Sequence, residues 1–412
     1  MKITRGYETE LDLNNEQRTA CFKHAGCARF AYNWGLARAV AVYRETSKRP
    51  NAMQLHRELN ALKPSDFPWM YQVSKCAMQE ALRDLDNAYR HFFRRLALKK
   101  KGKWKGKVGF PTFKKKSKGI GSFRLTGSIH VFSESIQLPR LGRLHLKEKD
   151  YLPIDAKVFS ATVSEQAGRW YVSVQVEEEQ DLPERTTTSA VGVDLGIKTL
   201  ATLSDGATFS NPRAAKHAQK RLRRLERQKS RRKKGSKNRQ KTCRKLAKQH
   251  ARAAYIRRDA AHKLTSHLVK NHALVAIEDL HVSGMLKNHK LAQAVSDSNF
   301  GEIRRQLTYK ATIYGTHLVV IDRFYSSSKT CSGCGYIKDE LALQERTYTC
   351  ESCGMVLDRD VNAARNLLHE ALRITGSSSG GDACGVGSSG LLNRVSEISH
   401  VEAGTKRYLG LS

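Results

Sequence analysis

The segment CSGCGYIKDELALQERTYTCESCGMVLDRDVNAA, residues 331–364, contains four cysteines in the pattern C-x2-C-x15-C-x2-C. They are Cys331, Cys334, Cys350 and Cys353. Two C-x2-C pairs are typical of a structural zinc site, because four thiolates complete a tetrahedral shell and leave no open position for catalysis. Gly335 and Gly354 directly follow these pairs and allow tight turns whose backbone amides point at the thiolates. Free buried thiols would not require this symmetric spacing, so the pattern predicts one structural Zn²⁺.

The composition indicates a polyanionic partner. The chain has 412 residues, enough for several domains, and its 73 Lys and Arg against 39 Asp and Glu give a net charge of +34. Nucleic acid is the expected partner and a membrane surface the weaker alternative. No apolar run is long enough to span a bilayer, and the start MKITRGYETE lacks a secretory signal. We therefore expect a cytoplasmic protein, and five scattered further cysteines fit a reducing compartment.

Residues 16–104 are predicted to form a helical domain, because apolar residues recur there at intervals of three and four. The stretch from Arg94 to Lys118 contains twelve Lys or Arg and no acid, and aromatic residues interrupt it. Such a loop can contact phosphates and stacked bases. The candidate nucleic-acid contacts here are Arg94, Arg95, Lys103, Trp104, Lys105, Phe113, Lys114 and Lys115.

Residues 105–185 change to short β-type runs, which predict a small β-barrel. Residues 1–15 can supply its first strand, in which case the helical domain is an insertion. The acidic, Thr-rich stretch 177–189 resembles a linker. This part of the chain is therefore expected to be all-β, next to an all-α part.

A mixed α/β layer fold is predicted for residues 186–330 and 355–374, because strand patterns alternate with helices there. The expected elements are strands 190–197, 199–204, 207–209, 273–278 and 317–321, a highly charged helix, a helix at 300–314 and a last helix from 360 to about 372. The zinc segment, residues 331–354, is an insertion into this domain. The Gly- and Ser-rich tail 375–412 is expected to be disordered.

Three acids lie on apolar elements of this domain: Asp194 within a strand, Glu278 at the end of a buried strand and Asp360 at the start of the last helix. A carboxylate in apolar surroundings is costly unless it is paired or binds a metal. Oxygen ligands suit Mg²⁺, and two such ions can activate a water and stabilise the leaving oxygen of a phosphodiester. The alternatives are a strand-end cap for Asp194, an ion pair for Glu278 and a helix N-cap for Asp360. Together the three predict a metal-dependent nuclease.

The stretch from Lys216 to Lys248 contains seventeen Lys or Arg and one acid, Glu226. Its leucines are too sparse to bury a helix. A solvated face is the usual explanation of a charge run, but such a face would alternate acids with bases, so we expect phosphate contacts. The candidates are Arg221, Arg224, Arg231, Arg232, Lys233 and Lys234.

The nuclease half of the chain resembles the TnpB family of RNA-guided nucleases encoded by insertion-sequence transposons, which are relatives of type V CRISPR effectors. The matching motifs are VGVDLGIK (191–198), AIEDL (276–280), SSSKTCSGCG (326–335), CESCG (350–354) and DRDVNAARN (358–366). The front half resembles the same family through ARFAYNWGLA (28–37), ALRDLDNAYRHFFRR (81–95) and GFPTFKKK (109–116). The resemblance covers about residues 16–372.

This resemblance implies an RNase H-like, RuvC-type nuclease domain with Asp194, Glu278 and Asp360 as its metal-binding triad and an inserted zinc knuckle. It also implies a β-barrel wedge domain and a helical recognition domain. Such proteins bind a guide RNA from the transposon end and cut double-stranded DNA beside a short flanking motif, with one protein expected per RNA. The alternatives are an RNA-guided DNA-binding repressor, an accessory factor in transposition, and a strand-transfer transposase.

Overall fold

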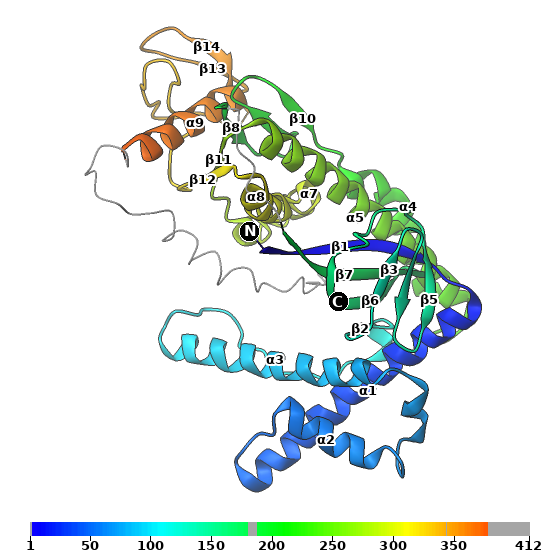
Figure 1. The fold of residues 1–412 in the computed structure, drawn as a ribbon. Coiled ribbons are helices and arrows are strands. Elements are labelled where there is room, and N and C mark those ends of the chain that lie inside the picture. The colour runs from blue at the N-terminus through cyan, green and yellow to red at the C-terminus, as the bar shows by residue number, and fades with distance from the viewer. Residues whose placement is uncertain (1, 180–187, 343, 378–412) are drawn as a thin grey trace. The chain divides into compact units, whose positions relative to one another are not determined.

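The computed structural model describes residues 2–179, 188–342 and 344–377 (Figure 1). They belong to two compact units, residues 1–180 and 181–412. Most of the predicted linker, 177–189, and nearly all of the predicted tail, 375–412, lie outside the described residues. Within these ranges, no helix combines the length and the apolarity that crossing a bilayer requires.

Unit 1 contains a seven-stranded antiparallel sheet with the order β2-β6-β7-β1-β5-β4-β3. Its strands are β1 (Lys2–Asp12), β2 (Ser122–Leu125), β3 (His130–Phe132), β4 (Ser135–Leu138), β5 (Gly142–Leu146), β6 (Lys157–Gln166) and β7 (Arg169–Glu179). β1 pairs with β7 from Lys2 to Leu11 and then with β5. The expected strand at the start of the chain is thus confirmed. The sheet has β2 and β3 as its two edges, so its order is open where a closed barrel was predicted.

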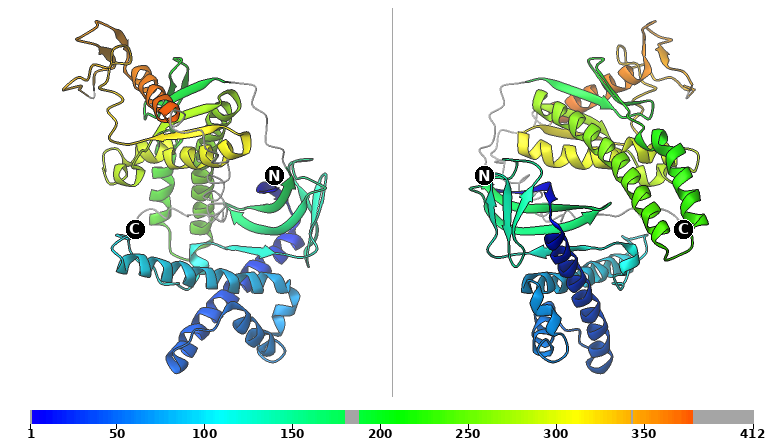
Figure 2. Two further views of the ribbon diagram at one scale, coloured as in Figure 1. Left: turned by 60° about the vertical axis from the view of Figure 1, so that its left-hand side comes forward. Right: turned by 90° about the vertical axis from the view of Figure 1, so that its right-hand side faces the viewer.

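Helices inserted between β1 and β2 complete unit 1. They are α1 (Asn15–Thr46), α2 (Ala52–Leu62), α3 (Lys75–Lys100) and the 3₁₀ turns Pro68–Gln72 and Lys116–Lys118. α1 begins with a capping box in which Asn14 and Gln17 bond each other's backbone amides. α1 crosses α3 closely (Figure 2), because Gly35 leaves space for Leu82 and Leu85. The predicted helical insertion is therefore confirmed.

Unit 2 contains a five-stranded sheet with the order β10-β9-β8-β11-β12. Its strands are β8 (Ala190–Asp194), β9 (Thr199–Leu203), β10 (Thr208–Ser210), β11 (Leu274–Glu278) and β12 (His317–Ile321). β8, β11 and β12 run parallel to one another, whereas β9 is antiparallel to both of its neighbours, β8 and β10. The predicted strand 190–197 ends at Asp194, so this acid closes the strand instead of lying in its middle. The mixed α/β class is confirmed.

The helices of unit 2 are α4 (Ala214–Arg231), α5 (Lys237–Asn271), α6 (Val282–Met285), α7 (Ala292–Ser298), α8 (Phe300–Tyr314) and α9 (Arg359–Ser377). The hairpin β13 (Thr347–Thr349) and β14 (Val356–Asp358) precedes α9. α9 ends at Ser377, whereas the last helix was expected to end near residue 372.

Alternating residues direct the two faces of the sheet toward different helices. Val193 and Ile277 belong to an apolar cluster with residues of α5 and α8. Ala276 belongs to a second cluster with Leu367 and Ala371 of α9. Because side chains on a strand alternate between faces, every residue that shares the parity of Ala276 in β11 faces α9.

The backbone of α9 lies directly against β8 at Gly192. A Cβ atom at Gly192 would lie 1.9 Å from the carbonyl oxygen of Ala364 and 2.8 Å from the amide nitrogen of Leu368. Ala276, the partner of Gly192 in the sheet, is also small. Glycine and alanine therefore allow α9 to pack closely on this face.

We expect Gly192→Ala to lower the free energy of unfolding of unit 2 by about 3 kcal/mol, the upper end of the range for overpacking. Backbone atoms of α9 cannot rotate away from the added methyl group as a side chain could. Urea denaturation of the full chain measures the loss, and hydrogen exchange should show faster exchange in α9.

Gly301→Ala in α8 is the matched control, since nothing lies within 4 Å of a Cβ added there. It should be neutral or slightly stabilising, because alanine is the better helix former. Equal stability of the two variants would contradict the close packing of α9.

Candidate metal sites

Asp194 and Glu278 lie side by side at the carboxyl edge of the sheet. Val193 pairs with Ile277 in the parallel register of β8 and β11, and the two acids are the next residues on each strand. They share parity with Gly192 and Ala276, so both side chains belong to the face that α9 covers. Both residues are half-buried. The sheet therefore places two carboxylates together, as the sequence predicted.

Asp360 reaches the same place from α9. Ala364 contacts Gly192, and Asp360 is four residues earlier, or about 6 Å along a helix. Asp194 is two residues beyond Gly192, or about 6.6 Å along a strand. The third acid is therefore level with the first. Asp358 caps the helix by accepting hydrogen bonds from the amides of Asp360 and Val361 at 2.9 and 3.1 Å, so Asp360 is not the N-cap.

The electrostatics of the site show that Asp194 is close enough to Asp360 and Glu278 to be repelled by both. Burial raises the pKa of Asp194 to about 7, and the charges of Asp360 and Glu278 contribute to the increase. The pKa of Glu278 is also raised, mainly by burial. Arg346 lies 3.8 Å from Asp360, which is too distant for a strong ion pair. A cation between the carboxylates would relieve this repulsion, so the residues fit a bound divalent metal.

The carboxylates are nevertheless more widely spaced than the thiolates. Among the described residues, only the four cysteines bring three or more donor atoms within 4.8 Å of one another. Asp360 also lines a cavity of about 270 Å³. The other lining residues are Leu195, Gly196, Ile197, Lys198, Met285, Phe300 and Arg346. Space for solvent or substrate therefore adjoins the acids, beside two cationic side chains.

The neighbouring acids Asp279 and Asp297 have other partners. Asp279 is ion-paired with Arg304 and Arg323, which hold its pKa below the usual range. Asp297 caps α4 by accepting hydrogen bonds from the amides of Ala215 and Lys216. Neither acid is available to the edge of the sheet.

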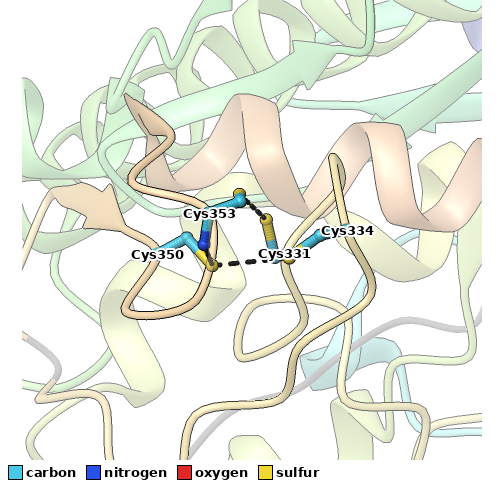
Figure 3. Close-up of side chains that lie close together, drawn as sticks. All are labelled: Cys331, Cys334, Cys350 and Cys353. Carbon is cyan, nitrogen blue, oxygen red and sulfur yellow. Dashed lines mark hydrogen bonds between the residues drawn. The ribbon is translucent and has the colours of Figure 1, made fainter.

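The four cysteines face one another from two facing loops (Figure 3). The Sγ atoms of Cys331 and Cys353 are 3.7 Å apart, and those of Cys334 and Cys350 are 3.6 Å apart. Tetrahedral zinc with bonds of about 2.3 Å requires a sulfur separation of about 3.8 Å, whereas a disulfide requires about 2.05 Å. The arrangement therefore fits the predicted zinc ion and excludes disulfides.

The two cysteine loops repeat the same backbone geometry. Cys331 and Cys350 each receive the amide hydrogen bond of the following glycine on their carbonyl oxygens. Gly335 and Gly354 have φ values of 78° and 71°, which explains the choice of glycine. A backbone amide of the second turn points at a thiolate, as expected: the amide of Cys353 donates to the Sγ of Cys350 at 3.4 Å.

Two asparagines, which the sequence reasoning missed, connect the zinc loops to α9. Asn362 is buried, accepts a hydrogen bond from the amide of Ser332 at 2.9 Å and donates to the carbonyl of Thr330 at 2.7 Å. Asn366, one turn later and also buried, donates to the carbonyl of Ser327 at 2.7 Å. The two asparagines lie four residues apart on an otherwise apolar helix face, and this spacing is the sequence pattern that could have identified them.

The predicted nucleic-acid contacts of unit 1 are mostly exposed, with Arg95 and Trp104 half-buried. The guanidinium of Arg95 lies 5.5 Å from the ring centre of Trp104, and the ammonium of Lys114 lies 4.1 Å from that of Tyr32. The exposed members are Arg94, Lys103, Lys105, Phe113, Lys114 and Lys115. Trp104 thus contacts Arg95 of α3 and Lys114 contacts Tyr32 of α1, which ties the loop to both helices.

All six candidates in unit 2 are exposed on the helical hairpin of α4 and α5. Arg232 also has a structural role, because its guanidinium donates to the carbonyl of Asn238 and to the hydroxyl of Thr242. Arg239, which was not predicted, donates to the carbonyl of Arg232. Leu225 is buried, but Ala214 is the only other buried residue described in α4, so the helix stays largely exposed, as expected.

We expect one zinc ion per chain by elemental analysis, and little or none in Cys350→Ser. Loss of a thiolate opens the tetrahedral shell, which should free the β13–β14 hairpin for proteolysis. Cys243→Ser in α5 is the control, since this half-buried thiol lies outside the cluster. Full zinc content in Cys350→Ser would exclude the four-thiolate site.

Asp194 should make the Mg²⁺-free protein less stable as the pH rises. Its pKa is raised from 3.8 in the unfolded chain to about 7 in the fold, so between these values only the unfolded state ionises. Above about pH 7 both states are ionised, and Asp194→Asn should melt roughly 5 °C higher than the wild type. The difference should vanish near pH 4. Thermal melts across this range measure it, and added Mg²⁺ should reverse the order.

Three family descriptions match parts of the chain. "Helix-turn-helix domain" (HTH_OrfB_IS605) matches residues 1–48, "Probable transposase" (OrfB_IS605) matches residues 173–289, and "Cas12f1-like, TNB domain" matches residues 300–367. Taken together, the last two matches include all three acids and the four cysteines.

Similar proteins cover most of the chain. A "Putative RNA-guided DNA endonuclease" from Streptomyces pristinaespiralis is 37% identical, over 92% of each chain. "Putative RNA-guided DNA endonuclease InsQ" from Escherichia coli K12 is 33% identical, over 89% of this chain and 92% of its own. A solved structure of CasPhi-2 (Cas12j) bound to crRNA gives a distant likeness, with a TM-score of 0.43, 10% identity and coverage of 90% and 98%. On the sequence relatives alone, the chain belongs to the TnpB family, the OrfB proteins of IS605-type elements.

Proposed function

We propose that this protein is an RNA-guided endonuclease of an IS605-type transposon, which cuts double-stranded DNA beside a short flanking motif. The observation that carries the proposal is the meeting of Asp194, Glu278 and Asp360 at one sheet edge. The two relatives above carry the name RNA-guided DNA endonuclease and align over about nine-tenths of the chain. A net charge of +34 supports polyanionic partners.

We assign unit 2 as an RNase H-like, RuvC-type nuclease domain. Its parallel strands β8 and β11, the antiparallel β9 and β10, and the helix α9 that carries the third acid support this assignment. The zinc segment 331–354 is its insertion, and one Zn²⁺ on the four cysteines would keep a structural role. In unit 1, the antiparallel sheet takes the place of the wedge domain and the inserted helices take that of the recognition domain.

The three carboxylates are proposed as the ligands of two Mg²⁺ ions, which suit oxygen donors spaced more widely than a single tight shell. When bound, these ions would supply an activated water and stabilise the leaving oxygen of the phosphodiester. The chain itself contributes the position of the acids, fixed by β8, β11 and α9. Lys198 and Arg346 line the adjacent cavity and are placed to contact the phosphate.

The exposed basic residues of the 94–118 loop and of the α4–α5 hairpin are proposed to bind the backbones of the guide RNA and the DNA. Base pairing with the guide would read the target sequence, while protein contacts would read the flanking motif and the heteroduplex shape. This division explains how a positive surface without base-specific geometry can serve a sequence-specific enzyme.

The description "Probable transposase" favours one alternative, a strand-transfer enzyme that uses the same acids. Strand transfer would join an exposed 3′ end of the element to a target. Incubation of the protein with transposon ends and a target plasmid distinguishes the two: hydrolysed ends alone support the nuclease, and a joined product supports the transposase. A guided repressor would not need all three acids.

We expect Glu278→Gln to lower the single-turnover rate of DNA cleavage by about 100-fold or more. Glutamine has the same size as glutamate, but its neutral amide is a poor Mg²⁺ ligand. Guide RNA binding should stay within about twofold. Cleavage of a labelled target duplex by the protein–RNA complex in Mg²⁺ measures the rate, and gel shift measures binding.

Asp259→Asn on α5 is the matched control, since Asp259 is exposed and forms an ion pair with Lys263 one turn along the same helix. It should cut at the wild-type rate. Cleavage by Glu278→Gln at the rate of this control would exclude the proposed metal site.

A further inference from the structure

Phe324 is the most exposed large apolar side chain that the structure describes. Its exposed fraction is 85%, against 68% for the next, Met53. Its exposed neighbours are polar or charged, namely Asp322, Arg323 and Ser326. A lone ring among polar groups does not form an apolar patch of the kind that docks a protein, because the core of such a patch is depleted of charge.

The turn that presents Phe324 is well fixed. The amide of Phe324 donates to the side chain of Asp322 at 2.8 Å, and the amide of Tyr325 donates to the carbonyl of Asp322 at 3.0 Å. Arg323 is ion-paired with Asp279 on one side. On the other, Tyr325 packs in the cluster that contains α9 residues, and its hydroxyl donates to the carbonyl of Asn366. The ring is therefore held in solvent by both of its neighbours.

The same two anchors belong to the elements that carry the acids. Asp279 directly follows Glu278, and Glu278 pairs with Ile321 at the end of β12. Asn366 lies on α9, which begins beside Asp360. Phe324 is three residues beyond Ile321, roughly 10 Å of chain at most. The ring is thus attached within a few nucleotide lengths of the carboxylates, on the edge of the sheet where they lie.

Cationic groups lie close to the ring in sequence and through Asp279. Arg304 and Arg323 share the single carboxylate of Asp279, and both guanidinium groups are partly exposed. Asp322 adds a second carboxylate, which is engaged by the amide of Phe324. A cation beside an exposed aromatic ring is the usual pairing for a single-stranded nucleic acid, in which the cation meets the phosphate and the ring stacks on the base. A phenyl ring has no hydrogen-bonding group that could distinguish one base edge from another. A stacking contact with it therefore tolerates any sequence.

We propose that Phe324 stacks on an unpaired base of the DNA strand that is being cut, and so positions the nearby phosphate at Asp194, Glu278 and Asp360. This inference rests on the proposed nuclease function and adds a positioning residue to it. The ring does not take part in the chemistry. Stacking on a base would restrain the strand on one side of the scissile bond, where the acids alone would hold only the phosphate.

The test compares Phe324→Ala, Phe324→Leu and Phe324→Trp in the complex with guide RNA and target DNA. Alanine and leucine should lower the single-turnover cleavage rate about 10- to 100-fold, the effect of losing one base–aromatic stack. Tryptophan should restore it, because it keeps a stacking face. Val356→Ala is the control, since Val356 is 63% exposed on β14 and has no proposed role. The melting temperatures of all four should match the wild type.

Two further measurements locate the stacked base. Single abasic substitutions along the cut strand should include a position that slows the wild type but has no additional effect on Phe324→Ala. In the non-cutting Asp194→Ala complex, 2-aminopurine at that position should be quenched, and Phe324→Ala in the same background should remove the quenching.

Cleavage by Phe324→Ala at the wild-type rate would overturn the proposal. Full rescue by leucine would also overturn it, since that would indicate apolar docking and not stacking. A lowered melting temperature in Phe324→Ala would indicate that another segment of the chain covers the ring. If the wild type fails to cut, the nuclease function fails, whereas quenching that depends on Phe324 would still support the stacking contact.

Discussion

The close approach of α9 to β8 at Gly192 is the constraint on which the rest of unit 2 depends. A methyl group there would meet the backbone of Ala364 at 1.9 Å, so the helix lies as near the strand as two backbones allow. That closeness lets a carboxylate on the helix join two carboxylates on the sheet, since side chains of Asp and Glu reach only a few ångströms. Residues with no chemistry of their own thus determine where the chemistry can occur.

The acids of the site are distinguished from their neighbours by the cations around them. Asp279 follows Glu278 immediately, yet the strand directs it to the opposite face, where Arg304 and Arg323 neutralise it. Among the described residues no ion pair to Asp194 is found, and its pKa is raised by burial and by the charges of Asp360, Glu278 and Asp358, whereas Arg359 lowers it. In a chain with 73 basic residues, it is unexpected that the described residues offer these three acids no ion pair closer than that of Arg346 with Asp360 at 3.8 Å, unless a metal is to compensate them.

Sequence patterns could predict features that depend on local spacing. The cysteine pairs, the strand acids and the helix start were all visible in this way, and the parity of Asp279 followed from a strand's alternation. Features that depend on distant packing were not visible. The open order of the unit 1 sheet depends on which edges meet, and the bond from Asn366 to the carbonyl of Ser327 joins two segments 39 residues apart. Neither the raised pKa of Asp194 nor the exposure of Phe324 follows from spacing, because both depend on what surrounds the side chain.

The cysteine loops and the acid site both contact α9, so a movement of this helix would move both of them. Asn362 and Asn366 bind the segment before the first cysteine pair, while the hairpin after it ends at Asp358, which caps the helix. The first turn of α9 therefore has a fixed end, a fixed face against Gly192 and two buried polar anchors. An acid at the start of a helix would otherwise fray with its first turn. With these restraints, Asp360 keeps its place although its charge and that of Asp194 repel each other, and zinc bound to the four cysteines would help to offset that repulsion.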